Sequence, residues 1–119
     1  MSIGTNLNND QRNTITITAT ITSGQTDSAA IDLKGYDLVG FIMPSAMTGT
    51  SISFKVSDYD GGTYAALYNS SNALISFTTA ASRAYKVTDD NLKGLRYIKL
   101  VSGSSEGANR SITLLCHKN

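Results

Sequence analysis

The sequence is poor in the residues that carry most covalent and metal chemistry. Its 119 residues include one cysteine, one histidine and no tryptophan. A single cysteine excludes a disulfide within the chain, so packing alone has to hold the fold, which suits assembly in a reducing cytoplasm. The same scarcity leaves too few ligands for a zinc site. The sequence therefore predicts neither a metal nor a cofactor.

Charge of one sign is also lacking, because ten basic and nine acidic residues give a net charge of +1. This balance provides no general attraction to nucleic acid or to an anionic membrane. The basic residues are scattered and more frequent toward the C-terminus, which favours a solvated face, with an acidic protein partner as the alternative. They are Arg83, Lys86, Lys93, Arg96, Lys99, Arg110 and Lys118.

Long hydrophobic runs are missing as well. No segment approaches the ~20 apolar residues of a membrane span. Residues 1–14 have neither the basic start nor the apolar run of a signal peptide. We therefore expect neither membrane insertion nor export by the standard route.

What the chain does contain favours one all-β domain. Its length is typical of a single domain, and a hydrophobic content of 40% with one proline predicts that most of it folds. Serine and threonine are abundant. The branched Cβ of threonine suits strands, and serine is common in turns, so the composition points to strands with polar outer faces.

Two segments alternate apolar and polar residues, which is the signal of a strand with one buried face. Residues 14–21 read TITITATI, and in residues 51–57, SISFKVS, the apolar positions are Ile52, Phe54 and Val56. Residues 38–43, LVGFIM, are apolar on both faces. This predicts a central strand that Pro44 ends and in which Gly40 admits a close backbone neighbour.

Shorter strands are expected at residues 29–33, 73–77, 83–87, 95–102 and 110–116, and residues 89–95 could form one helical turn. Eight or nine short strands joined by frequent turns are typical of an antiparallel β-sandwich or barrel. The prediction is a β-sandwich over residues 14–119. Residues 1–13, rich in asparagine and poor in apolar residues, are predicted to be a flexible arm.

Residues 57–68, SDYDGGTYAALY, look most like a functional motif. Asp58, Asp60 and Gly61 have the opening spacing of a calcium loop, but no acidic residue follows until Asp89. The stretch also resembles the Asp-box turn of β-propeller sialidases, although the run to Tyr64 is one residue short. The favoured interpretation is a hairpin, since Asp-Gly-Gly suits a tight turn. Calcium binding stays open as the alternative.

The tyrosines of this stretch suggest a second alternative. Tyr64 and Tyr68 are four residues apart on a presumed strand and face the same side, so their rings, with Tyr59, are candidates for stacking on a sugar. The competing interpretation is that one ring packs in the core and another places its hydroxyl at the edge.

Candidate catalytic residues are few. Cys116 and His117 are adjacent, but neighbours on a strand point to opposite faces, so Cys116 is interpreted as a core residue and His117 as exposed. Asp89 and Asp90 are interpreted as turn and cap residues rather than an acid/base pair. We therefore expect a protein that is not an enzyme.

Four features follow one another along the chain. They are a Ser/Ala entry into an apolar strand followed by Gly-Tyr, a strand that ends in Met-Pro, an Asp-Gly-Gly hairpin, and an Arg-Tyr-hydrophobic strand before a Gly/Ser loop. Their positions are Ser28–Leu33 with Gly35 and Tyr36, Met43 and Pro44, Asp60–Gly62, and Arg96–Ile98. In this order, over roughly residues 21–115, the chain resembles small virion-associated proteins of tailed bacteriophages and prophages.

The resemblance implies a jelly-roll module on the capsid exterior, either a decoration (cement) protein or the base of a head fibre. It further implies a homotrimer whose partner is the major capsid protein. The arm is not part of the resemblance. We expect it to clamp neighbouring capsid subunits, with Asn6, Asn8, Asn9 and Arg12 as candidate contacts. The alternative is a carbohydrate-recognition or fibre-tip module.

Overall fold

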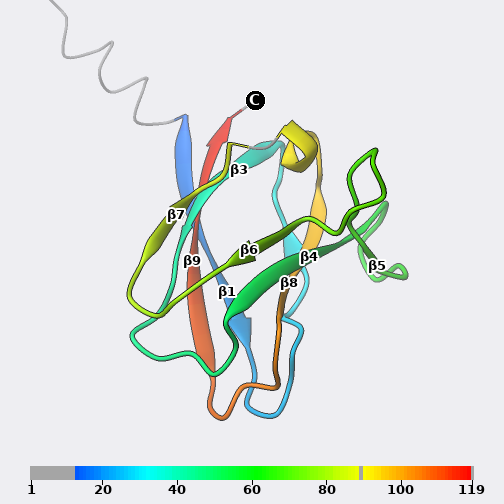
Figure 1. Ribbon diagram of the computed structural model, residues 1–119. Helices are drawn as coiled ribbons and strands as arrows, with labels where there is room; N and C mark the ends of the chain where they lie inside the picture. Colours follow the sequence, from blue (N-terminus) through cyan, green and yellow to red (C-terminus); the bar gives the residue numbers. More distant parts are fainter. Residues whose placement is uncertain (1–12, 89, 119) are drawn as a thin grey trace, which may run out of the picture.

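The computed structural model describes residues 13–88 and 90–118, which form two antiparallel sheets packed face to face (Figure 1). Sheet A has the strand order β1-β9-β3-β7, and sheet B has the order β2-β8-β4-β5, with β6 also paired to β4. The strands are β1 (Thr14–Ile21), β2 (Ile31–Asp32), β3 (Tyr36–Ile42), β4 (Ser51–Ser57), β5 (Ala65–Ala66), β6 (Ser76–Thr78), β7 (Ala84–Lys86), β8 (Tyr97–Ser102) and β9 (Arg110–Lys118), with a 3₁₀ turn η1 (Asp90–Leu92) before β8.

The topology is that of a jelly roll. The chain changes sheet at every connection except those that link β4, β5 and β6. Both β5 and β6 lie beside β4, and when they are counted as one position the two sheets have the strand order of the double Greek key. The predicted antiparallel β-sandwich is therefore confirmed. No helix among the described residues is long and apolar enough to cross a membrane.

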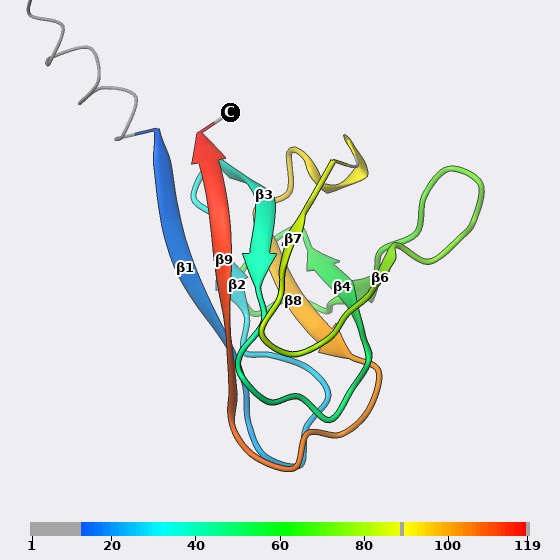
Figure 2. The ribbon, with the colours of Figure 1, turned by 60° about the vertical axis from the view of Figure 1, so that its left-hand side comes forward.

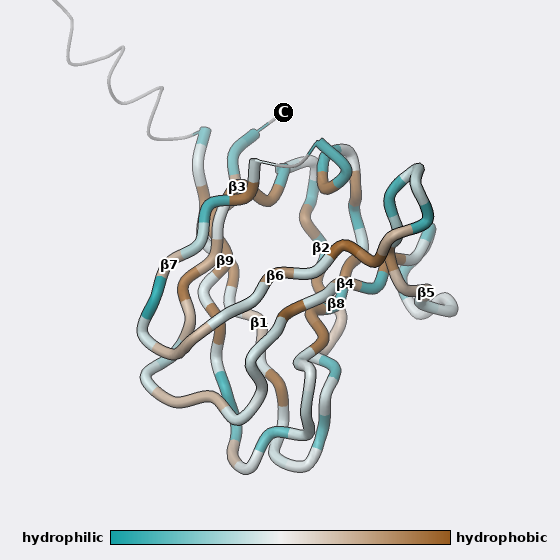
Figure 3. The backbone as a smooth tube through the Cα atoms, viewed as in Figure 1, coloured by the Kyte–Doolittle hydropathy of each residue, from teal (hydrophilic) through white to brown (hydrophobic). Residues whose placement is uncertain are grey.

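The core lies between the inner faces of the two sheets, because strands such as β8 and β9 alternate buried residues with more exposed ones. Phe41 on β3 and Phe54 on β4 are fully buried. Phe77 on β6 meets both rings edge to face, with ring centroids 5.4 Å from Phe41 and 6.0 Å from Phe54. This aromatic cluster joins sheet A to sheet B. Figure 3 shows the hydrophobic residues concentrated along the strands and hydrophilic residues in the connecting loops.

The strand predicted at residues 29–33 is shorter in the structure, where β2 contains Ile31 and Asp32 alone. The preceding backbone bonds to both sheets, since Ser28 N donates to Leu100 O at 2.8 Å and Ala29 N donates to Thr20 O at 3.1 Å. This crossing from one sheet to the other prevents a longer ladder.

The strand predicted at residues 38–43 is central, as expected, because β3 lies between β9 and β7. A Cβ on Gly40 would lie 3.0 Å from the carbonyl oxygen of Tyr85, which confirms the close backbone neighbour. The apolar residues on the outer face are nevertheless open. Val39 and Ile42 are 38% and 40% exposed.

Candidate functional site

One end of the sandwich is organised by the buried side chain of Glu106. The connections β1–β2, β3–β4 and β8–β9 meet at this end, the lower end in Figures 1 and 2. The Glu106 carboxylate accepts hydrogen bonds from Thr48 N at 2.8 Å, Gly49 N at 2.9 Å, Ser102 Oγ at 2.7 Å and Arg110 Nε at 2.9 Å. A single carboxylate thus fixes the β3–β4 loop against the β8–β9 loop.

These contacts also set the protonation of Glu106. Burial alone would raise the pKa of this carboxyl, but the hydrogen bonds from Thr48, Ser102, Gly49 and Arg110 outweigh it and lower the pKa to about 2. Glu106 is therefore ionised at neutral pH, with both oxygens bonded. Such a group stabilises loops, and it is not poised to exchange protons with a substrate.

The outer face of sheet B carries charged and aromatic side chains that are bonded to one another. Lys55 Nζ lies 2.6 Å from Asp27 Oδ2, and Arg96 Nε lies 3.1 Å from Asp32 Oδ1. The Arg96 bond lowers the pKa of Asp32. Burial raises the pKa of Asp27, but hydrogen bonds from Lys55 and Thr26 outweigh it and lower that pKa. Much of the charge on this face is therefore already compensated within the chain.

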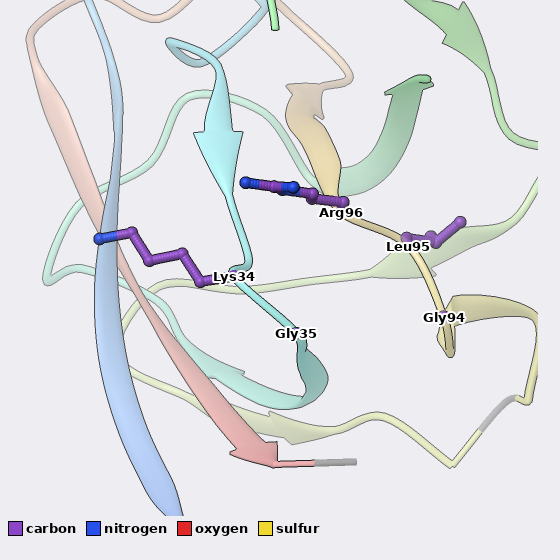
Figure 4. Close-up of a pocket in the computed structure, with 5 residues that line it drawn as sticks. All are labelled: Lys34, Gly35, Gly94, Leu95 and Arg96. Carbon is purple, nitrogen blue, oxygen red and sulfur yellow. The ribbon is translucent and has the colours of Figure 1, made fainter. Parts of the chain in front are cut away.

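A depression of about 440 Å³ lies beside this face, lined by Lys34, Gly35, Gly94, Leu95 and Arg96 (Figure 4). Lys34 and Gly35 form a tight turn, with φ angles of 56° and 86°. In Figure 4 the Lys34 and Arg96 side chains extend to one side and Leu95 to the other. The lining offers positive charge but no carboxylate, imidazole or thiol, and its arginine is bound to Asp32.

The outer face of sheet A is different, because it is built from threonines and aliphatic residues. The ladder registers place Thr16, Leu115, Gly40 and Lys86 in one row across the sheet, and Thr18, Thr113, Ile42 and Ala84 in the next. An irregularity in the pairing between Leu38 and Gly40 adds Val39 to this surface. We define the sheet A face as these nine outward residues, Thr16, Thr18, Val39, Gly40, Ile42, Ala84, Lys86, Thr113 and Leu115.

Two hollows mark the sheet A face. One of about 360 Å³ is lined by residues around Gly40, which has no side chain to fill the space between Leu115 and Lys86. The other, of about 470 Å³, is lined by Val39, Leu115 and the start of β1. Exposed aliphatic side chains beside hollows, with lysine as the only charged member of the face, are features of a protein-binding surface.

The structure places the tyrosines proposed for sugar stacking in different environments. Tyr59 and Tyr68 are 60% and 51% exposed. The Lys99 ammonium lies 4.6 Å from the ring centre of Tyr64, so it covers one face of that ring. The Tyr64 hydroxyl is buried without a hydrogen-bond partner, and burial, together with the charge of Asp60, raises its pKa.

The hairpin predicted at Asp60–Gly62 is confirmed. Gly62 N donates to Tyr59 O at 3.1 Å, Gly61 has a φ of 78°, and β5 pairs antiparallel with β4. Asp58 and Asp60 are exposed at this turn. Among residues 13–88 and 90–118, no three His, Cys, Asp or Glu side chains lie close enough together to hold a metal ion.

Cys116 and His117 diverge as predicted, since Cys116 is 1% exposed in the core and His117 lies on the surface. Burial raises the pKa of the Cys116 thiol to about 11, with a contribution from Asp37. The predicted arm contacts Asn6, Asn8, Asn9 and Arg12, and Asp89 of the Asp89–Asp90 pair, lie outside the described residues.

Sequence reasoning missed the two most organised features of the molecule. Arg110 was assigned to the solvated basic residues, but its side chain is 17% exposed and bonded to Glu106. The available signal was one acidic residue in a Gly/Ser loop followed four residues later by arginine. The sheet A face was missed because its members come from four strands, and only their register brings them together.

Comparison with known proteins gives a fold relationship. Neither the protein-family models nor the curated proteins match this chain. Among solved structures, the crystal structure of the SPBc2 prophage-derived protein YomS is similar, with a TM-score of 0.53 and 14% sequence identity. The similarity covers 87% of this chain and 93% of YomS. The two proteins therefore share a fold over nearly their whole lengths.

Proposed function

We propose that this protein is a structural component of a tailed-bacteriophage virion, a capsid decoration (cement) protein that binds the outer surface of the major capsid protein shell and stabilises it. The observation that carries the proposal is the sheet A face, where Val39 and Ile42 are exposed and Val39 and the half-buried Leu115 line two hollows. The fold shared with a prophage-derived protein supports the phage context. The sequence resemblance supports the capsid role.

The physical argument is one of many weak contacts. A flat face with aliphatic centres and threonine surroundings can pack on another protein surface without desolvating several charges. The net charge of +1 opposes neither approach nor close packing. A shell repeats the same binding site many times, so a decoration protein that contacts two subunits at once gains effective concentration.

The test is cosedimentation of the purified protein with capsids that lack it. Ile42→Lys places a charge on the sheet A face, and Leu74→Lys is the matched control, because Ile42 and Leu74 are 40% and 43% exposed and Leu74 lies outside the sheet A face, between β5 and β6. We expect wild type and Leu74→Lys to bind, and Ile42→Lys to lose at least about 10-fold in affinity. Equal binding of all three proteins, or no binding of wild type, contradicts the proposal.

The N-terminal segment is the second part of the proposed contact. Deleting residues 2–12 removes Asn6, Asn8, Asn9 and Arg12 but keeps Asn13, whose carbonyl oxygen accepts a hydrogen bond from Lys118 N at 2.7 Å. We expect weaker capsid binding with an unchanged urea midpoint. A truncated protein that no longer folds refutes the assignment of this segment as an arm.

Carbohydrate recognition is the second candidate function, favoured by the exposed rings of Tyr59 and Tyr68. A sugar ring would stack on these two residues, since one face of Tyr64 is covered by Lys99. The test is a glycan array with wild type, Tyr59→Ala and Tyr68→Ala. An array without hits, or hits that both variants retain, removes this candidate.

A further inference from the structure

The sandwich has one long sheet edge, and it is β1. The other strands at sheet edges, β2, β5, β6 and β7, contain two or three residues each. Strand β1 contains eight, TITITATI, without a charge or a proline. Natural proteins usually protect such edges with short strands, lysine, proline or a bulge, because an open edge pairs with another strand. Among the described residues, none of those protections is found along β1 between Thr14 and Ala19.

The backbone N–H and C=O groups of successive β1 residues point to opposite edges of the strand, and two hydrogen bonds fix which residues point outward. Asn13 O accepts from Lys118 N, so odd-numbered residues bond toward β9, and Thr20 O accepts from Ala29 N, so even-numbered residues point to the opposite edge. Within the described chain, no strand pairs with that edge at Thr16 or Thr18. Near Ile21 it is covered, because Ser28 bridges to Ile21.

The open part of the edge also leaves core residues incompletely covered. Ala19 and Ile21, beside the covered part, are 1% and 0% exposed. Ile15 and Ile17 point to the same side of the sheet but are only half-buried. Apolar side chains next to unpaired backbone groups mark a site for strand addition, since a pairing strand would bond the backbone and cover the side chains together.

We propose that β1 pairs antiparallel with β1 of a second copy of this chain, so that two sheets A join into one continuous eight-stranded sheet about a twofold axis. The occupant is a second copy because β1 is complementary to itself. In the register that sets Thr16 opposite Thr18 of the second copy, Ile17 meets Ile17, and threonine meets threonine on the outer face. Because β1 has no charged side chain, this pairing brings no like charges together.

This arrangement differs from the homotrimer implied by the sequence resemblance. Pairing of an edge with itself is isologous and closes as a dimer, whereas a trimer needs two different surfaces. The remaining strands at sheet edges are too short to supply a second surface that matches β1.

The test is the mass of the full-length protein in solution, measured by light scattering, with two variants at one position. Thr16→Pro removes an N–H that points away from β9 and leaves the ladder to β9 intact, and Thr16→Val changes only the side chain. We expect wild type and Thr16→Val at twice the chain mass of 12.6 kDa. The dissociation constant of the Thr16→Pro dimer should be about 30-fold higher, because two hydrogen bonds between the copies are lost.

A crosslink tests the same contact without relying on the proline variant. Opposed Ile17 residues form a non-hydrogen-bonded pair, where Cα atoms lie close enough for a disulfide. Under oxidation, Ile17→Cys should give a covalent dimer faster than Ser111→Cys on β9. A monomeric or trimeric wild type, a dimer indifferent to Thr16→Pro, or no preferential Ile17→Cys crosslink overturns the proposal. A monomeric wild type would indicate that the β1 edge pairs with a strand of another protein instead. None of these measurements uses capsids, so their outcome is independent of the test of the proposed function.

Discussion

Arg110 Nε donates to Glu106 Oε1 at 2.9 Å, and the two side chains are 17% and 0% exposed. A charge pair this well buried persists because Thr48, Gly49 and Ser102 bond the remaining positions of the carboxylate. The pair therefore fixes the loops at one end of the jelly roll, and its removal should be visible in stability.

Replacing Glu106 by glutamine should destabilise the protein by about 3 kcal/mol, because the amide removes the charge that Arg110 neutralises and turns one acceptor into a donor. The measurement is the free energy of unfolding from urea titration. Asp90→Asn is the control, since the Asp90–Lys93 pair is largely exposed. A loss as small as that of the control would contradict the role assigned to Glu106.

Acid should unfold the protein partly through the same carboxyl. Its pKa is about 2 in the folded chain against an ordinary value of 4.5, so its contribution is complete above about pH 4.5 and is lost as the pH falls toward about 2. Between these values the unfolding free energy of wild type should fall more steeply than that of Glu106→Gln. Asp27 and Asp32, whose pKa values are also lowered, contribute to the decline that both proteins share. Parallel pH profiles of the two proteins would count against this assignment.

Gly40→Ala should destabilise the sheet by about 1–3 kcal/mol, because the new Cβ would lie 3.0 Å from the backbone oxygen of Tyr85 on β7. The matched control is Gly107→Ala, whose Cβ meets nothing nearer than Thr48 Oγ1 at 3.6 Å. Thermal melts followed by circular dichroism would compare the two variants. Equal melting temperatures would contradict the prediction and show that β7 shifts away from the added methyl group at little cost.

Tyr64→Phe should stabilise the protein or leave it unchanged, with a gain up to about 1 kcal/mol. The hydroxyl that it removes is buried without a hydrogen-bond partner, so its desolvation is uncompensated. Tyr85→Phe is the opposite case, because the Tyr85 hydroxyl accepts a hydrogen bond from Ala80 N at 2.8 Å. Urea unfolding should give a lower midpoint for Tyr85→Phe and an equal or higher midpoint for Tyr64→Phe, and a clear loss for Tyr64→Phe would disprove the prediction.

Local alternation was enough to predict most of the strands. The inward positions Ile52, Phe54 and Val56 and the central position of β3 follow from side-chain period and apolar content, which are properties of short segments. The end of β3 before Pro44 and the turn at Asp60–Gly62 follow from backbone restrictions that single residues impose.

The candidate surfaces were not predictable in the same way. Leu115 and Val39 are 76 positions apart in the chain, and only the register of β9 with β3 makes them neighbours of one hollow. The burial of Glu106 likewise depends on Gly49, whose Cβ would collide with Ser102 Oγ. Long-range pairing decides both features, and it has no local signature in the sequence.

The pairing of β1 with β9 has a consequence for synthesis. Ile15 lies opposite Cys116, so β1 leaves the ribosome well before β9 and cannot form its ladder until β9 follows. Because β9 is also the strand between β1 and β3, sheet A cannot assemble before β9 has been synthesised. Folding is completed only after β9 has emerged, and until then the threonine-isoleucine strand needs protection from premature partners.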